Sequence, residues 1–176
     1  MKTLKKITLG LGMLIGLFLL IALLLPATYH VERSIIIEKP AQEVYPHVAN
    51  LHNWTAWNPW TASDPTVKYT ISGSGHEPGS VWAWNGEAVG IGTLTIQELH
   101  PEEKIVSRLA FKEPQMFESD DIWNFEETAE GTRVTWINEG KLDYPIDRVF
   151  GLFLDSTLGP DFEKGLAKLK EVAENS

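Results

Sequence analysis

The distribution of apolar residues divides the chain into two parts. Residues 7–25 form an uncharged, almost wholly apolar run of 19 residues, ITLGLGMLIGLFLLIALLL. A helix of that length extends about 28 Å, which is enough to cross the hydrocarbon core of a bilayer. No face of such a helix would be polar at any helical spacing, which argues against a buried core helix. The run therefore predicts one transmembrane helix near the N-terminus.

The residues on either side of this run predict its orientation. Three lysines stand immediately before it and favour a cytoplasmic N-terminus: Lys2, Lys5 and Lys6. A cleaved signal peptide is the alternative, although its apolar region is usually shorter, roughly 7–15 residues, and ends in small residues. Residues 25–27, Leu-Pro-Ala, offer a poor cleavage site. We therefore expect a cytoplasmic stub and membrane anchor over residues 1–28 and an extracytoplasmic domain over residues 29–176, with cleavage left open.

Beyond residue 28, apolar and polar positions alternate in short runs. Residues 29–38 predict a first strand, because every second residue from Val31 to Ile37 lies on one side. Six further strands are expected over residues 67–72, 80–85, 90–99, 104–111, 117–126 and 132–142. Short breaks rich in glycine, proline, asparagine or acidic residues separate them. Successive strands should therefore pair as antiparallel hairpins.

A short helical pattern lies between the first two strands. Pro40 opens it, and it covers residues 41–49. Pro46 lies inside this stretch and predicts a kink or an early end. Residues 51–60 follow as an irregular, aromatic segment.

A longer helical pattern closes the chain. It is expected over residues 162–174, capped by Asp161 and separated from a shorter helical stretch by Gly159-Pro160. One apolar stripe runs along it, made of Phe162, Leu166, Leu169 and Ala173. A single amphipathic helix has to cover one face of the antiparallel sheet. We therefore expect an α+β domain in which a strongly curved sheet of about six or seven strands wraps around this helix.

Charge and composition exclude several classes of function. The chain carries 15 basic and 24 acidic residues, and three of the lysines precede the apolar run. The domain is therefore strongly acidic and repels phosphate backbones, so no nucleic-acid partner is expected. Cysteine is absent, which excludes disulfides, thiolate metal sites and cysteine nucleophiles. The five histidines show no metal-ligand spacing and no dinucleotide fingerprint is present, so neither a metal nor a cofactor is expected.

Five short motifs are spread over the domain: Arg33-Ser34-Ile35-Ile36-Ile37, Trp54-x-x-Trp57-x-Pro59-Trp60, Trp84-Asn85-Gly86, Gly131-Thr132-Arg133-Val134-Thr135-Trp136 and Gly159-Pro160-Asp161-Phe162-Glu163. Together with the order of elements they resemble the SRPBCC superfamily, also called START-like or helix-grip, and within it the bacterial group named after polyketide cyclases. The resemblance covers about residues 31–174. It implies a cavity between the sheet and the C-terminal helix. Members bind sterols, lipids, quinones, hormones or polyketides, and a minority catalyse cyclisation or dehydration. The resemblance implies no shared catalytic set.

Large aromatic rings are the strongest sign of a binding site. Seven tryptophans are many for 176 residues, and a ring with a polar N–H suits the wall of an apolar pocket. The candidate ligand-binding residues are Trp57, Trp60, Tyr69, Trp84, Phe111, Trp123, Trp136 and Phe162. An ordinary aromatic core is the alternative for any one of these rings. One sheet and one helix, however, have difficulty closing tightly around all of them.

These observations support three hypotheses. The leading one is a membrane-anchored module that binds a hydrophobic small molecule, such as a lipid, a quinone or a polyketide-like compound. The second is a cyclase or dehydratase that uses Asp121, His47 or Tyr69 as acid or base. Asp121 is expected to lie in solvent near a strand end, which weighs against it. The third is a protein–protein interaction module with a vestigial cavity.

Gly165 interrupts the apolar stripe of the last helix. A glycine in the interior of a helix indicates either a close approach to the sheet or room for a ligand.

Overall fold

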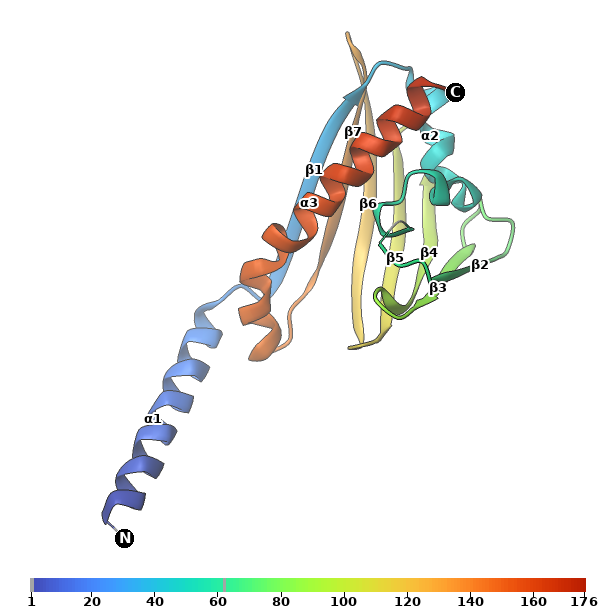
Figure 1. Cartoon of the computed structure of the whole chain (residues 1–176). Coiled ribbons are helices and arrows are strands. Elements are labelled where there is room, and N and C mark those ends of the chain that lie inside the picture. The colour runs from blue at the N-terminus through green and yellow to red at the C-terminus, as the bar shows by residue number, and fades with distance from the viewer. Residues whose placement is uncertain (1, 62) are drawn as a thin grey trace.

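The computed structural model describes residues 2–61 and 63–176. Its elements, in chain order, are α1 (Lys2–Leu24), β1 (Thr28–Ile37), α2 (Ala41–Ala49), the 3₁₀ helices η1 (Leu51–Ala56) and η2 (Pro59–Thr61), β2 (Lys68–Ser72), β3 (Val81–Gly86), β4 (Gly90–His100), β5 (Lys104–Glu113), β6 (Phe117–Thr128), β7 (Gly131–Lys141) and α3 (Ile146–Glu174). Figure 1 shows α3 lying along a curved sheet, with α1 projecting from one end of the domain.

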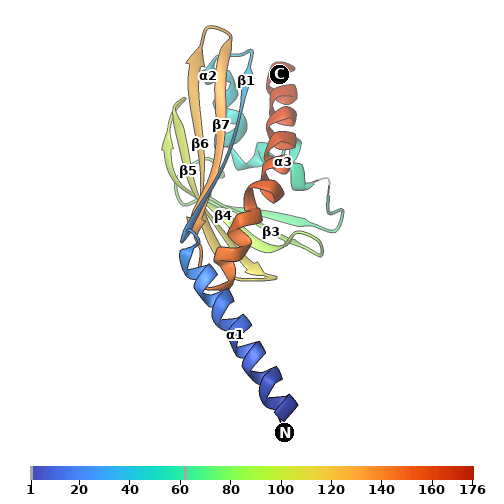
Figure 2. The ribbon, with the colours of Figure 1, turned by 90° about the vertical axis from the view of Figure 1, so that its left-hand side faces the viewer.

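The seven strands form one antiparallel sheet in the order β1-β7-β6-β5-β4-β3-β2. Strands β2 to β7 are therefore neighbours in the sheet as they are in the sequence, and β1 adds to the edge at β7. Turned by 90°, the molecule shows α3 and the helices after β1 on the same side of the sheet (Figure 2). The expected α+β helix-grip fold, with hairpin-connected strands and a long C-terminal helix, is confirmed.

Helix α3 differs from the expectation of a helix that starts at Asp161. It begins at Ile146 and continues through Pro160. Arg33 on β1 explains this continuity, because its guanidinium contacts Asp155 and Glu163, which lie on either side of the proline, both at 2.8 Å. Both halves of the helix are therefore held on one strand. The predicted N-cap role of Asp161 is wrong.

The aromatic segment after α2 caps that helix. The indole N–H groups of Trp54 and Trp57 donate to the carbonyls of Val48 and His47, at 2.7 and 3.0 Å. These carbonyls belong to the last turn of α2, where no intrahelical donor is available. Pro46 lies inside α2 without ending it, and the helix continues to Ala49. The segment expected to be irregular forms η1 and η2 and folds back over the sheet.

Helix α1 is the one described helix that is long and apolar enough to cross a membrane, over Lys5–Leu24. Its side chains are almost all exposed and it extends away from the domain (Figure 2).

Gly165 lies where α3 approaches the sheet closely. A Cβ at this position would come within 2.9 Å of the Trp136 ring and 3.0 Å of Pro59. We expect Gly165→Ala to lower the free energy of unfolding by about 1–3 kcal/mol, because overpacking outweighs the gain in helix propensity. Urea unfolding of the full chain in detergent micelles measures this change.

The exposed neighbour Lys164 gives the control: the free energy of unfolding of Lys164→Ala should stay within about 0.5 kcal/mol of that of the unsubstituted chain. Stabilisation by Gly165→Ala would contradict the close approach.

Candidate ligand-binding site

A cavity of about 560 Å³ lies between the sheet, α3 and the segment after α2. Half of its lining residues are aromatic: Trp54, Trp60, Tyr69, Trp82, Trp84, Phe111, Phe117, Trp136 and Phe162. Aliphatic side chains complete the apolar lining, among them Leu94, Leu109, Leu154 and Leu158. Such a volume is typical of sites for small organic ligands, which range from roughly 300 to 1,000 Å³.

Most of the candidate residues come together around this cavity. Those that line it are Trp60, Tyr69, Trp84, Phe111, Trp136 and Phe162. Trp57 and Trp123 do not line it: they are 1% and 0% exposed and lie in the core behind the wall. The Trp123 ring stacks on Trp136, with centroids 4.4 Å apart, and the Trp57 ring meets Trp123 edge-on. These two rings pack behind the cavity wall and support the Trp136 ring.

Several lining residues were not predicted. Trp82 shares its strand face with Trp84, so the two-residue alternation was a usable signal for it. Its ring stacks on Tyr69 at 4.7 Å, and its indole N–H has no partner among the described residues. Phe117 shares its strand face with Asp121 and Trp123, so the same signal was available for it. Trp54 and the α3 leucines had no such signal, because their place depends on how α3 and the segment after α2 fold over the sheet.

Stacked rings join α3 to the sheet at the centre of the site. Trp136 lies between Trp123 and Phe162, with ring centroids 4.4 and 4.1 Å away. Trp60 meets the edge of the Trp136 ring, and its indole N–H donates to Asp161 at 3.3 Å. Aromatic pairs in these geometries stabilise by about 0.5–1.5 kcal/mol beyond the area they bury. Trp136 therefore contributes both to the wall and to the attachment of the helix.

Asp121 is buried in this wall, contrary to the expectation that it lies in solvent. It is 3% exposed and lines the cavity. Its two carboxylate oxygens accept the indole N–H groups of Trp136 and Trp123, at 2.7 and 2.9 Å. Burial raises the pKa of Asp121 to about 6, although the hydrogen bonds that it accepts oppose the rise. The expectation failed because Asp121 lies in the middle of β6, a central strand, on the face of the sheet that encloses the cavity.

A second polar group lies beside this carboxylate. Asn138 is the cross-strand partner of Asp121 and also lines the cavity. Its amide oxygen accepts the hydroxyl of Tyr29, and its amide nitrogen donates to the Ser119 hydroxyl at 3.1 Å. Burial raises the pKa of Tyr29 to about 12, so this hydroxyl stays a donor at any physiological pH. The cavity is thus apolar with one acidic and one amide group in its lining.

Asp64 fixes the turn that closes one end of the cavity. It is 2% exposed, and its carboxylate accepts the backbone N–H groups of Thr66, Ala88 and Val89. Ala88 and Val89 line the cavity. The hydrogen bond from the Thr66 hydroxyl, followed by those from the backbone, lowers the pKa of Asp64 to about 2. The side chain therefore remains an ionised acceptor that ties the loop after η2 to the β3–β4 turn.

The other two acid–base candidates differ in position. His47 does not line the cavity; its ring lies 3.4 Å from the Ser176 hydroxyl, and burial lowers its pKa. Tyr69 lines the cavity, and its hydroxyl lies 3.4 Å from that of Thr61. Within residues 2–61 and 63–176, no group of three or more His, Cys, Asp or Glu side chains is arranged to hold a metal ion.

A curved antiparallel sheet that encloses an apolar cavity against a long C-terminal helix defines a helix-grip protein. Residues 28–174 match the family described as polyketide cyclase / dehydrase and lipid transport, and the chain belongs to this family. The expected SRPBCC membership is thereby confirmed. The chain is also 30% identical over 128 residues to a "Putative polyketide cyclase" of Streptomyces cyaneus, a match that covers 67% of this chain and 78% of that protein.

Solved structures share the fold at low sequence identity. Protein CV1439 from Chromobacterium violaceum superimposes with a TM-score of 0.60 at 15% identity, covering 85% of this chain and 98% of that one. The di-domain ARO/CYC StfQ from the steffimycin biosynthetic pathway gives a TM-score of 0.65 at 14% identity, covering 85% of this chain and 51% of that one. At these identities the likeness establishes the fold alone.

Proposed function

We propose that this protein is a membrane-anchored module that binds one hydrophobic small molecule in the cavity beneath α3. The observation that carries the proposal is the open cavity of about 560 Å³, whose walls are predominantly apolar and rich in aromatic rings. Large apolar side chains around an unfilled volume favour an apolar ligand, because each contact removes apolar surface from water. Membership of a family whose description includes lipid transport supports the same class of ligand.

The polar lining restricts the ligand further. Asp121 and Asn138 lie together on neighbouring strands, so a polar group of the ligand would meet them at one place. The oxygens of Asp121 are acceptors already engaged by two indole donors, and they have further lone pairs. A mostly apolar molecule with a hydroxyl or another donor at one end fits this arrangement. Lipids, quinols and polyketide-like compounds are such molecules.

Anchoring through α1 gives a separate prediction. The lysines before the apolar run support an orientation with the domain outside the cytoplasm. A reporter that is active only outside the cytoplasm, fused after Ser176, should therefore be active, and the intact chain should stay in the membrane fraction after a carbonate wash. A reporter active only in the cytoplasm would contradict the orientation. A soluble mature chain starting near Thr28 would contradict the anchor.

Ligand binding should be visible in the fluorescence of the protein itself. Trp84 and Trp136 line the cavity, so an apolar ligand that displaces water beside them should shift or quench their emission. Titration of the full chain in detergent micelles with a panel of lipids, quinones and polycyclic aromatics should give a saturable response at one ligand per chain. Mass spectrometry of the detergent-extracted protein should find a copurifying apolar molecule. A panel without any saturable response, with nothing copurifying, would contradict the proposal.

A second candidate function rests on Asp121. A buried carboxyl group with its pKa raised to about 6, facing a cavity, has the properties of a general acid or base. A cyclase or dehydratase would therefore use Asp121 as its acid or base. If the protein is such an enzyme, Asp121→Asn should lower turnover of a polyketide-like substrate by roughly 10²–10⁴-fold while leaving ligand affinity within a few-fold. Under the binding proposal no turnover exists to be lost, so the two functions are separated by a product assay.

A further inference from the structure

Apolar side chains are exposed at one end of the domain, outside the cavity. On the first turns of α3, Ile146, Phe150 and Phe153 are 57%, 62% and 58% exposed. Their spacing of four and three residues places them on one face of the helix. Met116, in the turn between β5 and β6, is 84% exposed. We refer to these four residues as the apolar rim.

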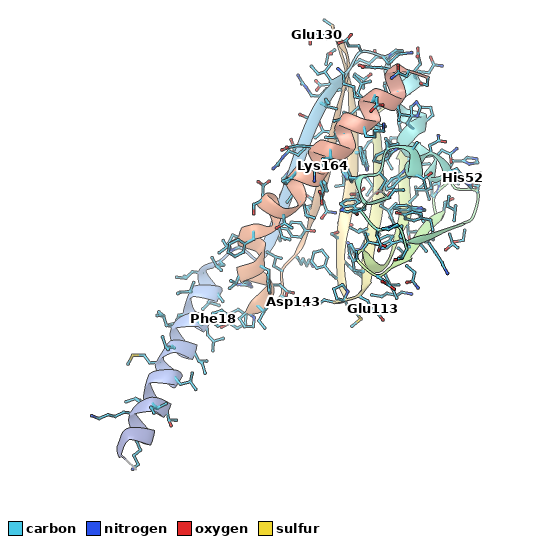
Figure 3. All side chains as sticks on the ribbon, viewed as in Figure 1. Phe18, His52, Glu113, Glu130, Asp143 and Lys164 are labelled. Atoms are coloured by element: carbon cyan, nitrogen blue, oxygen red, sulfur yellow. The ribbon has the colours of Figure 1, made fainter. Side chains whose placement is uncertain are left out.

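Contacts with α1 place this rim beside the end of the apolar helix. The hydroxyl of Tyr144 donates to the carbonyl of Leu19 at 3.1 Å, and the guanidinium of Arg148 lies near the carbonyl of Leu23. Leu19 lies five residues before the end of α1, which is roughly 7 Å along the helix axis. The start of α3 therefore lies level with the last turns of α1. In Figure 3, Asp143 and Glu113 mark this end of the domain, and Glu130 marks the opposite one.

The rim also adjoins residues of the cavity lining. Phe153 is exposed, whereas the next residue, Leu154, lines the cavity. Met116 is exposed, whereas the next residue, Phe117, lines the cavity. The two sides of the rim meet at Gln115, whose amide nitrogen lies 3.4 Å from the carboxylate of Asp147. Exposed rim residues and cavity-lining residues are thus direct neighbours in the chain, both on α3 and at the β5–β6 turn, so the rim borders the cavity.

We propose that the apolar rim inserts into the bilayer leaflet at the C-terminal end of α1 and forms the portal through which the ligand passes between that leaflet and the cavity. This inference rests on the proposed function, because it takes the cavity as the binding site and α1 as the anchor. A ligand that passes from the leaflet over the rim to the neighbouring apolar lining has little of its path in water. The rim side chains are apolar, the domain is acidic, and the neighbouring Arg148 is directed to the Leu23 carbonyl of α1, so apolar contact holds the rim to the lipid rather than attraction to anionic head groups.

Membrane contact can be measured without any ligand. The chain has no cysteine, so a single introduced cysteine carries a fluorophore at a chosen site. Met116→Cys and Phe150→Cys test the rim, and Glu130→Cys and Lys164→Cys are controls at the far end and on the exposed face of α3 (Figure 3). The labelled full chains are reconstituted in phosphatidylcholine vesicles that contain a lipid quencher attached near the head group. We expect strong quenching at positions 116 and 150 and little at 130 and 164.

The portal is tested by the rate of exchange. The double substitution Phe150→Ser and Phe153→Ser removes both aromatic rings of the rim, keeps Ile146, and leaves the cavity lining intact. Transfer of a fluorescent apolar probe from donor vesicles into the reconstituted chain should become roughly tenfold slower as apolar contact with the leaflet is lost. The equilibrium affinity for the same probe in detergent should stay unchanged. Thr157→Ser, an exposed change on the same helix, should alter neither quantity.

The outcomes separate the portal from the binding function. Equal quenching at positions 150 and 130 would overturn the membrane contact even if the probe binds the cavity. The fluorophore at position 150 could instead be protected from an aqueous quencher, unaffected by the lipid quencher, and crosslinked to a second copy of the chain. That result would assign the rim to a dimer interface and overturn the proposal. A double variant with an unchanged transfer rate would overturn the portal. Absence of probe binding in the unsubstituted chain would instead contradict the proposed function. The quenching of the labelled chains would still decide, independently, whether the rim contacts the membrane.

Discussion

Replacing Trp136 with phenylalanine is expected to lower the free energy of unfolding by about 2–3 kcal/mol and to weaken binding of an apolar probe. The phenyl ring keeps part of the stack between Trp123 and Phe162, but it removes the N–H that donates to Asp121 at 2.7 Å. A buried carboxylate then loses one of its two indole donors, and an unsatisfied buried acceptor is costly. Trp136→Ala should cost more, about 3–5 kcal/mol, because it also opens a void in the core.

Trp60 offers a matched control for this experiment. Its ring lines the same cavity, and its N–H also donates to a carboxylate, that of Asp161, but this carboxylate is partly exposed. Water can replace the lost donor there, so Trp60→Phe should cost less than about 1 kcal/mol. Urea unfolding of both variants in detergent measures the difference. Equal losses for the two substitutions would show that the bond to Asp121 has no special importance.

A pH-dependent difference in stability is expected between the unsubstituted chain and Asp121→Asn. Burial raises the pKa of Asp121 in the folded state to about 6, above its ordinary value of 3.8. The folded state therefore favours the protonated carboxyl, and this contribution to stability is fully present below pH 3.8 and is lost as the pH rises through 6. A difference of about two pKa units corresponds to about 3 kcal/mol. Asparagine does not titrate in this range.

The measurement compares the two chains at each pH. Every other titrating group is common to both, so the difference between their free energies of unfolding isolates Asp121. Between pH 4 and pH 7.5 this difference should change by about 2–2.5 kcal/mol in favour of Asp121→Asn, because part of the effect is already lost at pH 4. Asp120→Asn serves as the control, since that carboxylate faces solvent and pairs with Arg108. A constant difference across the range would show that Asp121 does not titrate with a raised pKa.

Local patterns were sufficient for most of the fold. The boundaries expected for the strands agree with β1 to β7 within about two residues, and helix α2 matches its predicted range. Alternation along a strand and punctuation by glycine, proline and asparagine depend on a few neighbouring residues, so one sequence carries them. Short breaks between strands determine hairpin pairing for the same reason. The membrane-spanning helix was similarly predicted from the number of consecutive apolar residues, because bilayer thickness sets the length that such a helix needs.

The site was only partly determined in this way. Alternation placed Asp121 on the same strand face as Trp123, yet it could not decide which face of the sheet is enclosed. Asp121 is buried because it lies on a central strand, on the face that carries Trp123 and lines the cavity. In the same way Trp57 and Trp123 belong to the core and Trp54 and Trp82 to the wall, a division made by contacts between segments far apart in the chain.

What the sequence by itself determined is the apolar helix at the N-terminus, the meander of strands, the long closing helix and a surplus of large rings in the domain. Only the tertiary structure decided that α3 continues through Pro160, because Arg33 on a distant strand holds both halves of the helix. It likewise decided that the rings leave an open cavity around a buried carboxylate, and that exposed apolar residues of α3 lie beside the end of α1. These features depend on contacts between residues that are remote in sequence, and such contacts leave no periodic signal in a single chain.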